Sequence, residues 1–175
     1  MSNALHKRIP ICVSLCFYPI RELKEIVDRL ATDLDVLVSP HGARLIAEVS
    51  GGLPRKAKHH LQNMRRHIPG AQSRQIHLKE VRRFLREFGV DAKGLTAQDR
   101  LYLSYLRDVG SASLESLAIC LGLDAPYVRQ QIEPLLIQQH RLVVIGPSGR
   151  RLTPAGKQWI EQHNSNTVKE NNHDE

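Results

Sequence analysis

The sequence predicts a mainly α protein in which a small helical bundle is followed by a winged helix-turn-helix domain with a short β-hairpin wing. Apolar residues recur three and four positions apart along most of the chain, which is the spacing of helices that bury one face. Towards the C-terminal end, three short helical patterns are followed by two β-rich strings around a Gly-Pro-Ser-Gly turn. Three helices and then a hairpin is the order of a winged helix, a module that binds nucleic acid or other proteins.

Composition narrows the class of protein. The 175 residues suffice for two small domains, and the 41% apolar and 25% charged content is ordinary for a globular protein. No apolar run approaches the roughly 18–20 residues of a membrane helix, and the N-terminus lacks the apolar core of a signal peptide. The three cysteines indicate reduced thiols rather than a disulfide framework. We therefore expect a cytoplasmic protein that does not associate with membranes.

The first 18 residues are predicted to end in a strand. Apolar residues occupy alternate positions from Ile11 to Phe17, so they would share one face of an extended chain. No other strand pattern occurs before the wing. We interpret this segment as the edge of a sheet whose remaining strands are missing.

A bundle of four helices is predicted over residues 19–93. The first three helices begin at a proline, and Ser39 is a plausible N-cap of the second. The second, third and fourth helices stop at glycine or proline. The third helix also carries a dense basic surface. The four helices are expected from Pro19, Pro40, Pro54 and about His77, and their core-facing residues include Leu23, Val27, Ile46, Leu61, Met64, Val81 and Leu85.

The winged helix is predicted over residues 95–163. Thr96 is a suitable N-cap for its first helix, and Asp99 stands at the reciprocal capping position. Ser113 is expected to cap the second helix and Asp124 the third.

The wing and the end of the chain complete the predicted domain. The two wing strands are expected at residues 141–145 and 151–153, and Pro154 opens a last helix. Residues 164–175 are polar with few apolar side chains, which predicts a disordered tail.

Charge is unevenly distributed between the two predicted domains. Residues 1–94 hold 17 Lys and Arg against 9 Asp and Glu, whereas residues 95–175 hold 8 against 9. The basic character therefore lies outside the winged helix. Any contact between the wing and DNA must use a few local charges rather than a broad positive field.

Three strings in a fixed order resemble the C-terminal half of the RuvB family, the AAA+ motors that drive Holliday junction branch migration. LHKRIPICVSLCFYPIRELKEIV is similar to the end of the family's ATPase core, and HGARLIAEVSGGLPRKAKHHL is similar to the lid helices with their Gly-x-Pro-Arg sensor-2 motif. EPLLIQQHRLVVIGPSGRRLTP is similar to the family's winged-helix ending. The resemblance implies that residues 1–18 are a stub of the AAA+ core and residues 19–93 an AAA+ lid.

The resemblance implies roles for three arginines. Arg8 matches the arginine finger, a catalytic residue that acts in trans on the nucleotide bound by a neighbouring subunit. Arg55 matches sensor 2, which contacts ATP when a nucleotide-binding core is present. Arg150 matches the wing arginine that contacts DNA. A guanidinium suits these roles because it pairs with phosphate oxygens.

The residues of the winged helix also predict DNA contact. Arg150 and Arg151 lie beside the hairpin tip, where paired arginines suit phosphate contact. The candidate recognition helix, residues 126–139, offers Arg129 as its one cation beside Glu133 and several Gln. Such a helix is poorly suited to sequence-specific readout, so contact led by the wing fits better. The alternative is that the two arginines only solubilise a turn.

The sequence predicts no cofactor and no metal for this chain alone. It contains no Gly-x-x-x-x-Gly-Lys-[Ser/Thr] phosphate loop, so the resemblance implies ATP and Mg only if the chain is joined to a nucleotide-binding core. Cys12 and Cys16 lie near His6, but no second pair of ligands follows for zinc. His59 and His60 are adjacent on a helix, diverge by about 100° and cannot both bind one ion.

We therefore predict the DNA-binding and nucleotide-sensing C-terminal part of a RuvB-like, ATP-dependent branch-migration motor that is not catalytic alone. The resemblance implies double-stranded or junction DNA, a AAA+ core or ring-forming copies of the chain, and a junction-binding protein as partners. Two alternatives stay open. One is a standalone winged-helix module that binds DNA or a protein, and the other is an ATPase relic retained as an assembly subunit.

Overall fold

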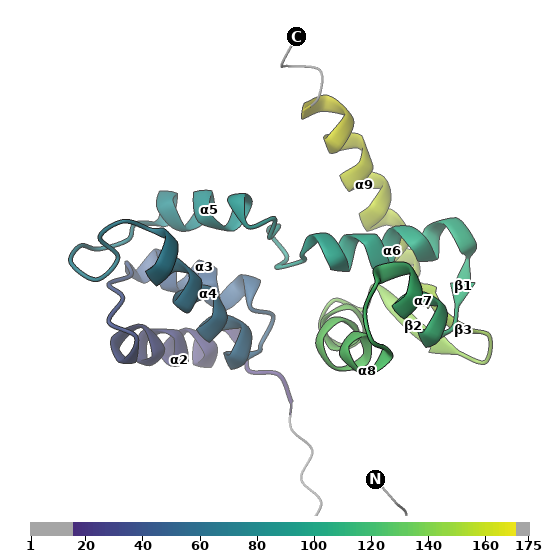
Figure 1. The fold of residues 1–175 in the computed structure, drawn as a ribbon, viewed down its shortest axis with the longest axis horizontal. Coiled ribbons are helices and arrows are strands. Elements are labelled where there is room, and N and C mark those ends of the chain that lie inside the picture. Colours follow the sequence, from purple (N-terminus) through teal and green to yellow (C-terminus); the bar gives the residue numbers. More distant parts are fainter. Residues whose placement is uncertain (1–15, 171–175) are drawn as a thin grey trace, which may run out of the picture.

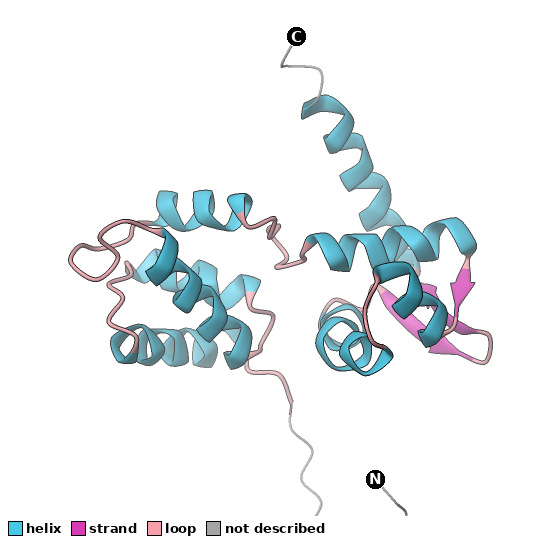
Figure 2. Ribbon diagram, viewed as in Figure 1, coloured by secondary structure: helices cyan, strands magenta, loops and turns pink. Residues whose placement is uncertain are grey.

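The computed structural model describes the backbone of residues 16–170 and the side chains of residues 16–163. Helices dominate, with a small sheet in the second half of the chain (Figures 1 and 2). The predicted fold class is confirmed. The strand expected over residues 11–17 lies outside the described residues except for Cys16 and Phe17, which are not in a strand.

The first body is a four-helix bundle. It contains α2 (Ile20–Asp33), α3 (Pro40–Val49), α4 (Pro54–His67) and α5 (Leu78–Glu87). Proline opens α3 and α4, where its fixed backbone angle suits the first helical position. The Ser39 hydroxyl accepts a hydrogen bond from the Gly42 amide at 3.3 Å, which confirms the predicted cap of α3. Val38 and Ile76 form one parallel bridge, which ties the entry of α3 to the entry of α5.

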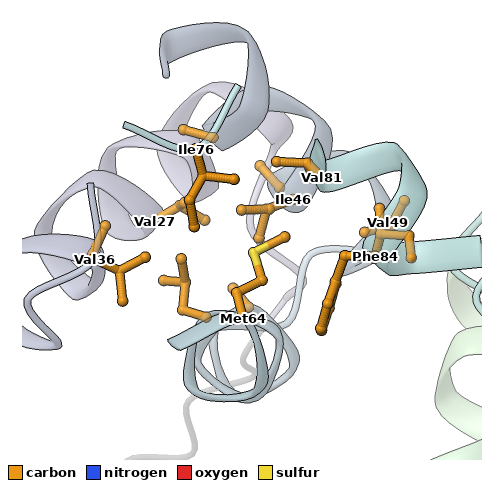
Figure 3. Packing of buried hydrophobic residues seen from close by; sticks show 14 of the residues in the cluster. Val27, Val36, Ile46, Val49, Met64, Ile76, Val81 and Phe84 are labelled. Carbon is orange, nitrogen blue, oxygen red and sulfur yellow. The ribbon is translucent and has the colours of Figure 1, made fainter. Parts of the chain in front are cut away.

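The core of this bundle is built from the predicted helical faces. Leu23, Val27, Ile46, Leu61 and Val81 are all fully buried. Figure 3 shows Val27, Ile46 and Val81 among the packed side chains of this core. Helix α2 packs on α3 and α4, and α5 packs on α3. The polar faces of the same helices are left in solvent, so most of the basic residues of the four helices are exposed.

A short linker joins the bundle closely to the second body. Gly94 has φ +76°, and a Cβ at that position would overlap the Val49 carbonyl group at the end of α3. His140 Nε2 lies 2.9 Å from the carbonyl oxygen of Lys93, and the Arg100 guanidinium donates to backbone carbonyls at both ends of the linker. The linker is therefore held by both bodies.

The second body is a winged helix. Its helical elements are α6 (Ala97–Val109), α7 (Leu114–Leu121), α8 (Ala125–Tyr127) and α9 (Pro154–Glu170), and α8 continues through the π-helical turns η1 (Val128–Ile132) and η2 (Pro134–Gln139). Strands β1 (Ser111–Ala112), β2 (Val143–Gly146) and β3 (Gly149–Leu152) form an antiparallel sheet in the order β1-β3-β2. Its core contains Leu103, Leu106, Leu117, Leu135 and Leu136.

Two predicted caps of the winged helix are confirmed. Thr96 and Asp99 form the reciprocal capping box at the start of α6, and the Ser113 hydroxyl accepts a hydrogen bond from the Ser116 amide at 3.0 Å. Asp124 occupies the predicted N-cap position of α8, but its side chain does not form the predicted capping hydrogen bond.

Several local features differ from the sequence-based expectation. The wing strands are shifted to β2 and β3, and β1 was not expected because two residues show no alternation. The recognition helix contains Pro134, which has no amide to donate, and the helix widens into π turns on both sides of it. Helix α9 continues to Glu170 instead of ending at residue 163, because residues 157–170 contain no glycine or proline to stop it.

Candidate nucleic-acid interface

The wing is a tight hairpin held against the third strand. Gly146 pairs with Gly149 across a turn of two residues, Pro147 and Ser148. Gly149 has φ +105°, and a Cβ there would overlap the carbonyl group of Ala112 in β1. The close approach of β1 fixes the base of the wing, so the side chains that follow Gly149 have defined directions.

The register of the sheet separates the two predicted wing arginines. Arg150 pairs with Ile145 and Ala112, whereas Arg151 pairs with Val144 and Ser111. Successive residues of a strand point to opposite faces of the sheet. Arg150 therefore faces the helical core, and Arg151 faces solvent.

The Arg150 side chain is bound inside the domain. Its guanidinium donates to both carboxylate oxygens of Glu133, at 2.8 and 3.4 Å, and the Tyr102 hydroxyl donates to the same carboxylate at 3.1 Å. The side chains of Arg150 and Glu133 are only 14% and 5% exposed. The Glu133 carboxylate raises the pKa of Arg150, and burial, followed by Glu133, raises the pKa of the Tyr102 hydroxyl. This triad fastens the wing to the recognition helix and to α6.

Arg151 lines an open groove on the other face of the wing. The groove, of about 600 Å³, lies between the sheet, the end of α6 and the start of α9. Arg107 and Lys157 line it with Arg151, together with apolar side chains and Glu161. Arg107 is engaged by Asp108 at 2.8 Å. Alternation along β3 was the signal in the sequence that could have separated Arg151 from Arg150.

Arg129 lies on the recognition helix rather than on the wing. It is exposed on η1, and both Arg129 and Arg150 are close enough to Glu115 to help lower the pKa of that carboxyl, after hydrogen bonds from its own amide and from Ser113. The structure therefore does not gather Arg129, Arg150 and Arg151 on one surface. DNA contact by each of them stays a prediction.

The two arginines matched to sensor 2 and to the arginine finger do not belong to the winged helix. Arg55 is exposed in the first turn of α4, and Arg8 lies outside the described residues. The next residue, Lys56, is largely buried, and burial lowers its pKa despite the nearby Asp99. Burial, then Lys56 and His59, also lowers the pKa of His60 to about 4.

No metal site is found in the part of the chain that the structure describes. Within residues 16–163, no three His, Cys, Asp or Glu side chains come together as a metal site would require. Cys16 and Cys120 are free thiols, and Cys12 and His6 lie outside the described residues. None of the described helices is long and apolar enough to cross a membrane.

Two family models match the two bodies of this chain. The model of the RuvB AAA lid domain matches residues 18–91, and the model of the RuvB C-terminal winged helix domain matches residues 92–161. The two matches follow each other directly, and they divide the chain within the linker that separates the two cores.

Related proteins and structures agree with these models. The Holliday junction branch migration complex subunit RuvB of Prochlorococcus marinus is 32% identical over 95% of this chain and 48% of that protein. The protein of the same name from Parasynechococcus marenigrum is 36% identical over 93% of this chain and 47% of that protein. The structure of the Thermotoga maritima RuvB Holliday junction branch migration motor matches 92% of this chain and 55% of its own, with a TM-score of 0.82 and 29% identity. The chain thus spans about half the length of these relatives.

Proposed function

Because this chain belongs to the RuvB family, of which it carries the lid and winged-helix domains, we propose that it is the DNA-engaging, non-catalytic part of a branch-migration motor. Its winged helix contacts the phosphate backbone of a duplex arm of a junction. Copies of the chain form a ring with a junction-binding protein, in the cytoplasm, and the assembly serves DNA recombination and repair.

The outward position of Arg151 carries this proposal. Its guanidinium lies on the solvent face of the wing and makes no ion pair with any residue that the structure describes. A phosphate group can therefore approach it without breaking an internal contact. Arg150 supports the same contact indirectly, because its bond to Glu133 holds the wing in place. Arg129 gives a weaker contact from the recognition helix.

ATP hydrolysis in such a motor needs a nucleotide-binding core that this sequence does not contain. Arg55 is exposed at the start of α4, so it is accessible to a phosphate, but Lys56 beside it is largely buried. One arginine does not make a nucleotide site. If the chain were joined to such a core, ATP would bind there, with Mg, as the hydrolysed substrate. Arg55 would contact its phosphates, and Arg8 would reach the nucleotide bound by the neighbouring subunit.

A salt series of DNA binding tests the role of the wing. Fluorescence anisotropy would measure the affinity of the chain for duplex and four-way-junction DNA between low and moderate salt. Arg151→Gln should weaken binding several-fold at low salt and lower the slope of log K against log salt by about 0.9, because one phosphate contact is lost. Arg21→Gln, which removes one exposed charge from α2, is the matched control and should leave the slope unchanged.

The opposite result would favour a protein-docking module. Val144 and Ile145 of the wing are 37% and 53% exposed, and exposed apolar side chains on a hairpin suit a protein partner. If Arg151→Gln binds DNA like its control, the wing does not contact phosphate. The standalone module would then be the better account of the winged helix.

A further inference from the structure

Helix α5 of the lid carries a stripe of four cations. Lys79, Arg82, Arg83 and Arg86 are all exposed and stand at positions i, i+3, i+4 and i+7, which place them on one face of a helix. The opposite face buries Val81, Phe84 and Leu85 in the core of the bundle, so the cationic face is fixed towards solvent. We call these four residues the α5 stripe.

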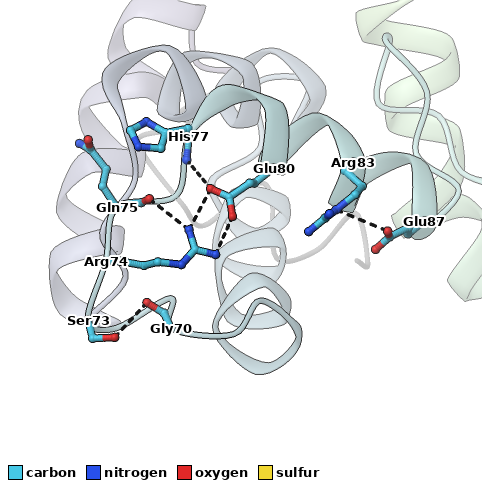
Figure 4. Close-up of polar contacts among 8 residues, drawn as sticks. All are labelled: Gly70, Ser73, Arg74, Gln75, His77, Glu80, Arg83 and Glu87. Carbon is cyan, nitrogen blue, oxygen red and sulfur yellow. Dashed lines mark hydrogen bonds and ion pairs between the residues drawn. The ribbon is translucent and has the colours of Figure 1, made fainter.

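Nearby acids engage one member of the stripe and leave the other three without an ion pair in the described part of the chain. Glu80 is held by Arg74, with nitrogen–oxygen distances of 2.6 and 3.0 Å, and by the His77 amide at 3.1 Å (Figure 4). Its pKa is lowered to about 2, mainly by the hydrogen bond from Arg74. Glu87 lies 3.7 Å from Arg83.

Three members of the stripe therefore keep their charge available. Lys79, Arg82 and Arg86 form no ion pair with any residue in the described part of the chain. Neighbours three and four positions apart on this face repel each other, and like charges at that spacing destabilise a helix. A bound polyanion would relieve this repulsion.

The dimensions of the stripe suit a nucleic-acid backbone. The four cations span seven residue steps of the helix, which cover about 10 Å because a helix rises 1.5 Å per residue. One DNA strand places a phosphate about every 3.4 Å along its axis, so this length corresponds to about three nucleotide steps. The stripe residues also line an open hollow of about 310 Å³ together with Glu80.

We propose that the α5 stripe is a second phosphate-binding surface that takes the sugar-phosphate backbone of nucleic acid, separate from the wing. This proposal rests on the proposed function for one point, namely that the nucleic acid is DNA. The contact is independent of sequence, because it reads charge and spacing alone. Such a contact would account for the basic character of the chain lying in the lid rather than in the winged helix domain.

A pair of matched double variants tests this surface in the full chain. Arg82→Gln/Arg86→Gln should lower the affinity for duplex DNA about tenfold at low salt and reduce the salt slope by between one and two, as expected for two lost phosphate contacts. Arg21→Gln/Arg29→Gln on α2 removes the same net charge from two exposed residues that have no ion pair within the described region, and it should leave the slope unchanged. Arg82→Lys/Arg86→Lys keeps the charges and should keep the slope.

Folding and partner class are checked with the same proteins. The thermal midpoint of Arg82→Gln/Arg86→Gln should equal or exceed that of the parent chain, because the variant relieves repulsion. Poly-glutamate is the second probe and should compete weakly with the duplex.

Two results would overturn the assignment. The first is a salt slope that does not change in Arg82→Gln/Arg86→Gln. The second is that poly-glutamate binds the parent chain as tightly as DNA does and that Arg82→Gln/Arg86→Gln abolishes this poly-glutamate binding. Failure of the proposed function would be seen separately, as an unchanged affinity and salt slope in Arg151→Gln.

Discussion

Two arginine–glutamate pairs of similar geometry lie in very different surroundings. In the winged helix, Arg150 and Glu133 approach to 2.8 Å and are 14% and 5% exposed. In the lid, Arg74 and Glu80 approach to 2.6 Å and are 46% and 22% exposed. The distances alone would rank the lid pair as the stronger. Burial reverses this order, because an uncompensated buried charge costs far more than an exposed one.

Cations in both domains also differ in whether they already have a partner. The winged helix commits Arg150 to Glu133, Arg107 to Asp108 and Arg100 to backbone carbonyls, and it leaves Arg151 without an ion pair among the described residues. The lid leaves most of the α5 stripe unpaired in solvent. Net charge therefore says little about which arginines can meet a phosphate. What decides it is whether each guanidinium already has a partner.

The largest effect is expected from breaking the buried pair. Glu133→Ala would leave the Arg150 guanidinium partly buried without its carboxylate and remove the acceptor of the Tyr102 hydroxyl. We expect the free energy of unfolding to fall by about 3 kcal/mol, measured by urea denaturation followed by circular dichroism. Glu115→Gln removes an exposed acid close to the same arginine and should shift the urea midpoint far less.

Replacing both partners sharpens this comparison. Glu133→Leu/Arg150→Met removes both charges and keeps apolar volume, so it should recover most of the stability that Glu133→Ala loses. A Glu133→Ala chain as stable as its parent would show that the triad does not fasten the wing.

Much of the fold could be predicted because its signals are local. Ser39, Thr96 and Ser113 stand beside the helices that they cap, and apolar spacing identified the core faces of the helices. The site was harder, because its partners are distant in the sequence. Glu133 lies 17 positions from Arg150 and 31 from Tyr102, and no periodicity links residues so far apart.

Strand register is the part of the site that the sequence could have supplied. Arg150 and Arg151 are adjacent, so no strand can present both to one ligand. Which of them faces inward depends on the two-residue turn at Pro147 and Ser148 and on the pairing with β1. The two residues of β1 form too short a segment to show alternation, so this second constraint could be seen only in the structure.

A pH effect is expected from His60, a largely buried histidine of the lid. Arg150 keeps its proton at every accessible pH, so it needs a charged partner when it is buried. His60 can instead lose its proton, and burial favours the neutral ring. Its pKa is about 4 in the folded chain against an ordinary value of 6.5, so the unfolded chain binds more protons between these values. Stability should therefore fall as the pH drops from 7 to 5, by up to about 2 kcal/mol from this group.

Two histidine variants isolate this contribution. His60→Gln should remove part of the difference between the urea midpoints at pH 7 and pH 5. His59→Gln changes the exposed neighbour, which contacts Asn63, and should retain most of the difference. Equal pH dependence in His60→Gln and the parent chain would contradict burial of the neutral ring.

The smallest effect is expected from the exposed pair. Glu80→Gln removes the carboxylate that Arg74 and the His77 amide contact, but solvent reaches both side chains and the lost attraction is screened. We expect the thermal midpoint to fall by no more than about 2 °C at pH 7. Because Arg74 holds the pKa of Glu80 near 2, this contribution is present above the ordinary pKa of 4.5 and is lost as the pH falls from there towards 2. If Glu80→Gln lowered the thermal midpoint as much as Glu133→Ala does in the same measurement, the nitrogen–oxygen distance rather than burial would determine which pair contributes more to stability.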